Sequence, residues 1–284
     1  MKQFDFHRFA TLLKWHLVGN RREILNVYFG LTVAFFAMML FFTQVFGVND
    51  VNLGDDAADW LYASRVHSAM GAGVFAVIAT MVVGATRIFH NMKETRQRTT
   101  FLMLPASNAE KWLLRFLHAT VLLFVVACLA LVTADVVRML IAPMWGKPFV
   151  SGVAWLLSGT GEEIDAAPSD GYGWFLLIIF SFVVLHHALF VLFGTLFRKN
   201  PFLLTCAVMF FLMLCFAHVA FWVKDAGWMQ HAVFLRFDEM DGLVVPPLIW
   251  TATVVHYLLA AFFYWLSFRL FSRMQVINNK WLNV

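Results

Sequence analysis

Histidines lie within several long apolar segments of this sequence, where ionisable side chains are rare. His186 and His187 are adjacent, and His218 and His256 each stand in a different apolar run. An ionisable residue inside a membrane-spanning segment is costly and commonly marks the pathway of an ion or a substrate. A neutral histidine that hydrogen-bonds to a neighbouring helix is the alternative explanation. We therefore carry these four residues forward as candidate pathway residues that could equally be packing residues.

Histidines in a helical bundle could also ligate a haem iron, as in the membrane anchor of a redox complex. Two axial ligands of one iron need to lie at the same depth. With a rise of 1.5 Å per residue, His218, His256 and His187 fall at roughly 8, 15 and 22 Å from one end of their segments. No pair matches well in depth, although helix tilt absorbs part of the offset. The haem-binding anchor stays open as an alternative.

The sequence lacks the common catalytic motifs. It has no G-x-x-x-x-G-K-[ST] stretch for nucleotide phosphates, no H-E-x-x-H and no G-x-S-x-G. The Glu162-Glu163 pair has Ala167 four residues further on instead of a basic residue, so it does not fit a protease that uses paired glutamates. We predict that the chain is not itself an enzyme, with an integral-membrane lipid- or peptide-modifying enzyme as the alternative.

The loop over residues 90–112 combines three features in one stretch. Basic residues precede the apolar run Phe101-Leu102-Met103-Leu104-Pro105, and Ser107 and Glu110 follow with the spacing of a capping box. This spacing predicts that a helix begins at Asn108. An exposed apolar run costs free energy unless something covers it. Either the loop folds against the inner rim of its own bundle, or it docks onto a partner protein.

The elements that must position these residues are membrane-spanning helices. The composition is 61% hydrophobic and 13% charged, whereas soluble domains average about 25% charged residues. The apolar runs are long enough for helices of roughly 20 residues, the length that crosses a bilayer. We predict an all-α integral membrane bundle of six spans in a single domain, at about 27–47, 67–89, 113–141, 172–196, 202–223 and 246–270.

The distribution of basic residues predicts that both termini are cytoplasmic. With the N-terminus inside, 16 of the 21 Lys and Arg residues fall on the cytoplasmic side and 5 on the outer side. This bias is the one that sets membrane orientation. Because the net charge of +4 follows the membrane in this way, it does not indicate nucleic-acid binding.

Three further segments are not simple spans. Residues 4–25, within an N-terminal elbow over 1–26, are predicted to form an amphipathic helix in the membrane interface, with Phe6, Phe9, Ala10, Leu13 and Leu17 on one stripe. Residues 149–157 could form a short surface helix, and 224–247 could form a short re-entrant or interfacial hairpin before the last span. Asp135 and Arg138, one helical turn apart, are predicted to form an ion pair.

The whole chain resembles a membrane subunit of a bacterial type-2 ATP-binding-cassette exporter. Residues 101–111, Phe-Leu-Met-Leu-Pro-Ala-Ser-Asn-Ala-Glu-Lys, are similar to the LPxSxxEK stretch of these permeases, and the tail Phe271-Ser-Arg-Met-Gln-Val276 is similar to theirs. The order of elbow helix, six spans and a main cytoplasmic loop between spans two and three resembles the family as well.

The resemblance implies a function and a set of partners. A separate cytoplasmic ATPase, which would hold the ATP and magnesium, would dock on the 90–112 loop, and this chain would bind no cofactor itself. The loop residues implied in coupling are Phe101, Leu102, Leu104, Pro105, Ser107, Glu110 and Lys111. Arg198 and Lys199 would form a smaller second contact. The chain would pair with a second copy or a related permease in the bacterial inner membrane. Its substrate would be amphipathic, a peptide or lipid-like, and the third helix would transmit movement of the loop into the bundle.

Overall fold

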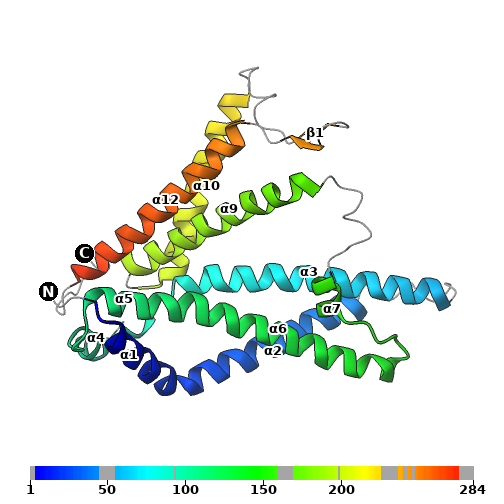
Figure 1. Cartoon of the computed structure of the whole chain (residues 1–284), viewed down its shortest axis with the longest axis horizontal. Coiled ribbons are helices and arrows are strands. Elements are labelled where there is room, and N and C mark those ends of the chain that lie inside the picture. Colours follow the sequence, from blue (N-terminus) through cyan, green and yellow to red (C-terminus); the bar gives the residue numbers. More distant parts are fainter. Residues whose placement is uncertain are drawn as a thin grey trace. The chain divides into compact units, whose positions relative to one another are not determined.

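The chain is a multi-pass, all-α membrane protein. The computed structural model describes residues 4–44, 55–92, 94–158, 169–197, 199–224, 236–238, 242–244 and 247–274. Within these residues, six helical segments are long and apolar enough to cross a membrane (Figure 1). They are α2 (Arg21–Gln44), α3 (Asp55–Ala85), the third span made of α5 (Asn108–Leu117), η4 (His118–Leu122) and α6 (Leu123–Ile141), α9 (Ser169–Leu196), α10 (Pro201–Lys224) and α12 (Pro247–Ser272).

The N-terminal helix is shorter than predicted. The helix α1 (Phe6–Gly19) ends before Asn20, and Arg21 already belongs to the spanning helix α2. The side-chain amide of Asn20 donates to the carbonyl oxygen of His16 at 2.7 Å. Asparagine side chains compete with the backbone for hydrogen bonds in this way and favour breaks between helices. The predicted stripe is divided, because Phe6 and Ala10 are exposed while Phe9, Leu13 and Leu17 are half-buried.

The third span is not an uninterrupted α-helix. It begins at Asn108, as the capping box predicts, but its α-helical path changes to a π-helical turn, η4, between α5 and α6. A π-helical turn has a wider hydrogen-bonded ring than an α-helix and disturbs the regular i to i−4 ladder. The third span, which we expect to transmit movement of the loop, thus contains a π-helical turn at residues 118–122.

The chain forms two compact units, and each is described by itself. The first comprises Met1–Phe9, Val82–Thr120 and Glu163–Val284. Within it, α9 packs along α12, and a side-chain hydrogen bond of 2.8 Å joins Thr195 to Ser267. Gly194 lies so close to Thr86 that a Cβ atom there would meet the Thr86 carbonyl oxygen at 2.7 Å, so only glycine permits this approach.

The second unit comprises Ala10–Met81 and Val121–Glu162. Helix α2 packs on α6, where the hydroxyls of Tyr28 and Thr133 lie 2.8 Å apart. Small side chains on α6 let the helices approach closely. The core of this unit consists of Phe35, Met39, Ala69, Met70, Val77, Ala127, Ala130, Leu131 and Ala134.

Two short elements complete the described chain. The helix α7 (Gly152–Ser158) overlaps residues 149–157, where the sequence predicts a surface helix. In the predicted re-entrant segment, the strands β1 (Arg236–Asp238) and β2 (Gly242–Val244) pair antiparallel, with Phe237 opposite Leu243. The remainder of residues 225–246 lies outside the described residues, and the re-entrant path stays a prediction.

Candidate functional site

The 90–112 loop is a folded structure attached to the end of α12. It contains η3 (His90–Met92), the helix α4 (Thr95–Leu102), a turn over 103–107 and the start of α5. The buried ring of Phe101 lies 6.3 Å from that of Phe271, centroid to centroid, and the guanidinium of Arg115 lies 4.7 Å from the centre of the Phe101 ring. Phe271 in turn stacks on Phe89 at 4.9 Å. Aromatic and cation–π contacts of this kind favour one fixed arrangement of the rings.

The predicted capping box is present. The Ser107 hydroxyl accepts from the backbone N–H of Glu110 at 3.2 Å, and the Glu110 carboxylate accepts from the backbone N–H of Ser107 at 2.9 Å. The ammonium group of Lys111 donates to the carbonyl oxygen of Leu102 at 2.6 Å, which satisfies a free carbonyl at the end of α4. Both ends of the 103–107 turn are thus fixed by side-chain hydrogen bonds.

The Glu110 carboxylate also binds the N-terminal segment, which the sequence did not reveal. Its oxygens accept from Nε of Arg8 at 2.8 Å, from a second Arg8 nitrogen at 2.5 Å and from the backbone N–H of Asp5 at 2.8 Å. The Glu110 side chain is fully buried. The hydrogen bond to Glu110 raises the pKa of Arg8 above its ordinary value. We call this group, Asp5, Arg8, Ser107 and Glu110, the Glu110 hub.

Part of the hub has a sequence signature. Asp5 caps α1, because its carboxylate accepts from the backbone N–H of His7 at 2.9 Å, and aspartate is a preferred residue at this position. Nothing local, however, connects Arg8 with Glu110, 102 residues later.

The residues predicted to couple to a partner fall into two groups. Phe101, Glu110 and Lys111 are buried within the chain, and Leu102, Leu104 and Ser107 are half-buried. Pro105, by contrast, is exposed, and so is its neighbour Met103, at 75%, which the sequence did not single out as a coupling residue. The buried residues hold the turn, while Met103 and Pro105 form its exposed tip.

The second predicted contact is only partly described. Arg198 lies outside the described residues, whereas Lys199 is exposed in the turn between α9 and α10. Asn200 has a positive φ of 48°, a conformation that asparagine tolerates better than most residues. Pro201 then begins α10, where the fixed φ of proline suits the first helical position.

The histidines of the apolar segments mostly bond to neighbouring residues within the first unit. Nδ1 of the buried His187 lies 2.7 Å from the hydroxyl of Tyr264, and Nδ1 of His256 lies 3.2 Å from that of Ser181. Ser181 and His187 are separated by about 9 Å along α9, at 1.5 Å per residue. The structure therefore places His187 and His256 at different levels and does not bring them together as an axial pair.

The other two histidines have different surroundings. His186 donates from Nδ1 to the carbonyl oxygen of Phe182 at 2.8 Å, within its own helix. The ring of Phe182 lies beside both His186, at 3.8 Å, and His256, at 6.5 Å. His218 is exposed on α10. The buried Nε2 of His187 has no hydrogen-bond partner among the described residues, so these contacts do not assign the histidines to packing alone, and the pathway role stays a prediction.

The chain matches no protein-family model, no curated protein and no solved structure. The family suggested by the sequence motif consequently stays a prediction, and the contacts of the chain's own residues are what point to a function.

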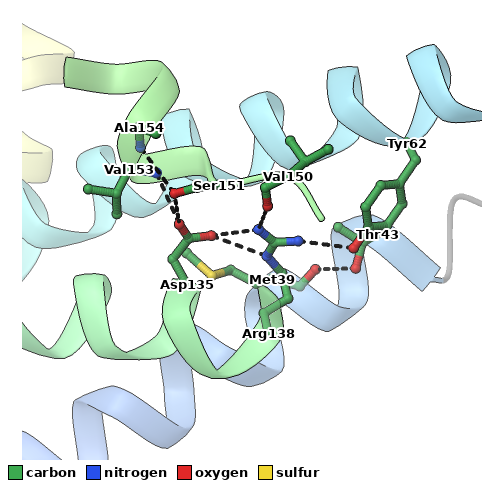
Figure 2. A network of polar contacts seen from close by, with 9 residues as sticks. All are labelled: Met39, Thr43, Tyr62, Asp135, Arg138, Val150, Ser151, Val153 and Ala154. Atoms are coloured by element: carbon green, nitrogen blue, oxygen red, sulfur yellow. Dashed lines mark hydrogen bonds and ion pairs between the residues drawn. The ribbon is translucent and has the colours of Figure 1, made fainter. Parts of the chain in front are cut away.

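A second polar group lies in the other unit, around Asp135 and Arg138. Figure 2 shows the Arg138 guanidinium between Asp135, the hydroxyl of Tyr62 and the carbonyl of Val150. Nitrogen–oxygen distances are 2.7 Å to Asp135, 3.0 Å to Tyr62 and 2.6 Å to Val150. Both charged side chains are 1% exposed. The predicted ion pair is confirmed, and it is the centre of a larger network.

The same carboxylate also fixes the start of α7. Asp135 accepts from the hydroxyl of Ser151 at 3.1 Å and from the backbone N–H of Val153 at 3.0 Å, while the Ser151 hydroxyl accepts from the N–H of Ala154 at 3.1 Å. The first N–H groups of a helix have no partner within the helix. Here side chains supply the partners for two of them. We call Tyr62, Asp135, Arg138, Val150, Ser151 and Val153 the Asp135 hub.

Proposed function

We propose that this chain is the permease subunit of an ATP-binding-cassette exporter, driven by a separate cytoplasmic ATPase that docks on the 90–112 loop. The observation that carries the proposal is the exposed apolar tip at Met103 and Pro105, held on a buried and fully bonded base. The proposed cargo is amphipathic, a peptide or lipid-like, because spans with few charges cannot supply a hydrophilic channel.

The fixed base is what makes this loop suitable for transmitting movement. A flexible loop would change its own conformation when a partner moved it. Here Phe101 connects the tip to α12, Glu110 connects it to the N-terminal segment, and Lys111 connects it to α4. Displacement of the tip would therefore move those elements with it. Met103, 75% exposed on this base, is the apolar side chain that we expect the partner to cover.

The proposed complex contains two membrane subunits and two ATPases. The second membrane subunit would be another copy or a related permease, in the bacterial inner membrane with both termini cytoplasmic. The excess of basic residues in the N-terminal segment and in the 90–112 loop supports this orientation. Lys199, exposed in the short turn before α10, is the proposed second contact together with Arg198.

A matched pair of substitutions tests the proposal. The chain is co-expressed with a cytoplasmic ATPase of the same organism that carries the G-x-x-x-x-G-K-[ST] stretch. ATP hydrolysis is then measured for the purified complex and for the ATPase alone. Met103→Asp places a charge in the proposed contact, so we expect loss of co-purification and of stimulated ATP hydrolysis. Met103→Leu is the control, because it keeps an apolar side chain of similar size at the same exposed position.

Two results would overturn the proposal. One is that Met103→Asp binds and stimulates the ATPase as well as Met103→Leu does. The other is that residue 103, once replaced by cysteine, reacts only with a reagent added from outside intact cells. A Soret band in the purified chain would support the haem-binding alternative instead.

A further inference from the structure

The segment over 142–158, which we call the cap, is fixed to the second unit by its buried side. It comprises η5 (Ala142–Trp145), a turn and α7. The Asp135 hub bonds to Val150, Ser151 and Val153, and the ring of Trp155 stacks on that of His67 with 4.4 Å between centroids. Gly146, with a φ of +65°, makes the turn after η5. The cap is therefore a rigid part of this unit.

The other side of the cap is apolar and exposed. Met144 is 81% exposed, Phe149 62%, and Leu157 81%. Met144 continues a row of exposed side chains that recurs every four residues along α6, formed by Val132, Val136 and Leu140. Side chains four residues apart lie on one face of a helix. Because α6 belongs to a membrane span, an exposed apolar row on it is suited to contact lipid, and the exposed side of the cap continues the same surface.

We propose that the cap lies in the boundary layer of the bilayer, with its exposed side covered by phospholipid. Continuity with the lipid-facing row of α6 identifies the occupant. Trp145 and Trp155 in the cap have the chemistry of residues that gather at this level of a membrane. Interfacial segments of this kind bury their apolar face at the boundary between headgroups and acyl chains.

The polar groups of the cap fit this location. A helix end in or near lipid must satisfy its backbone N–H groups within the protein. At the start of α7, Asp135 and Ser151 accept from the N–H groups of Val153 and Ala154. Arg138, whose charge would be costly beside lipid, is paired with Asp135 and 1% exposed. Because the Asp135 hub pairs these polar groups within the protein, the cap can lie against the bilayer without leaving them unsatisfied.

Lipid quenching tests this proposal on the full-length chain. Cys128, Cys206 and Cys215 are replaced by serine, and single cysteines at Leu157, Phe149, Leu140 or Gln97 carry a fluorophore. The protein is reconstituted in phosphatidylcholine vesicles that contain lipid with a nitroxide either near the headgroup or near the chain end. Iodide serves as the quencher from water. Leu140 is the lipid-facing control, and Gln97, exposed on α4, is the water-facing control.

We expect the probe at Leu157 to be quenched more strongly by the headgroup-level nitroxide than by the deep one, and several-fold more than the probe at Gln97. The probe at Phe149 should be quenched in the same way as the probe at Leu157, so the test does not depend on the folding of one variant. Quenching of Leu157 and Phe149 by iodide but not by lipid would place the cap in water and overturn the proposal. Protection from both quenchers, with disulfide cross-linking between chains, would identify a second copy as the occupant and overturn it as well.

Discussion

The Glu110 hub and the Asp135 hub use the same chemistry in different surroundings. In each, one carboxylate accepts hydrogen bonds from an arginine and from backbone N–H groups at a segment that it fixes in place. At Glu110 the arginine lies 102 residues away and its side chain is 30% exposed. At Asp135 the arginine follows three residues later and is 1% exposed. The Glu110 hub joins distant parts of the chain and has a partly exposed arginine, whereas the Asp135 hub is excluded from solvent.

This difference sets what each hub can contribute. An ion pair that is partly solvated adds little stability and is weakened by salt. A buried pair is different, because losing one partner leaves the other charge without compensation. The Asp135 hub therefore contributes more to stability than the Glu110 hub, whose arginine can reach water.

The largest expected effect is that of Asp135→Ala. It leaves the buried Arg138 guanidinium without a counter-charge, so we expect the unfolding free energy to fall by about 3–5 kcal/mol. Reversible unfolding in mixed detergent micelles, followed by circular dichroism, measures the change. The double variant Asp135→Leu with Arg138→Met should recover more than half of the loss, and a double variant as unstable as Asp135→Ala would show that the charges are not the cause.

Glu110→Ala should have a smaller effect, about 2 kcal/mol, because charge-assisted hydrogen bonds are lost but the partner Arg8 can reach water. The same unfolding measurement applies. At about 1 M salt the screening length falls to about 3 Å, so the loss of unfolding free energy caused by Arg8→Ala should become smaller. The loss caused by Asp135→Ala should stay nearly the same, because buried pairs are screened much less. Equal salt sensitivity at the two hubs would contradict the proposed difference in burial.

Gly152→Ala tests how tightly the cap is seated. A Cβ atom at residue 152 would lie 2.9 Å from Cε and 3.1 Å from Cβ of Met70, so the end of the Met70 side chain must move and the backbones must separate slightly. We expect a loss of about 1–3 kcal/mol, as for other overpacked sites. Gly30→Ala in α2 is the control, since no atom lies within 4 Å of its added Cβ, and alanine there should stabilise the helix by about 0.5–1 kcal/mol.

The smallest expected effect is that of Ser107→Ala, about 1 kcal/mol, because it removes one side-chain cap of α5 and leaves the Glu110 carboxylate in place. Thr100→Ala is the matched control, as the Thr100 hydroxyl bonds only to the carbonyl of Arg96 on the exposed face of α4. A change at Thr100 as large as that at Ser107 would remove the capping box as the explanation. The unfolding midpoint of the two variants decides between these results.

The features that the sequence predicted correctly are local ones. The six spans follow from the length of apolar runs, and the start of α5 at Asn108 follows from the spacing of Ser107 and Glu110. The pair Asp135 and Arg138 follows from one helical turn of spacing. Boundaries were less accurate. Helix α3 begins at Asp55, although the sequence predicts its span only from 67, because a helix can extend beyond its apolar part.

The sequence by itself determined which segments are helices, which of them can cross a bilayer and which neighbours in a helix meet, because helix geometry fixes contacts three and four residues apart. Only the tertiary structure decided that Glu110 binds Arg8, that Tyr62 and Val150 join Arg138, and that Phe101 turns inward while Met103 remains exposed. Those contacts depend on which helix faces are packed together, and the spacing of residues along a chain carries no information about segments that meet after a hundred residues.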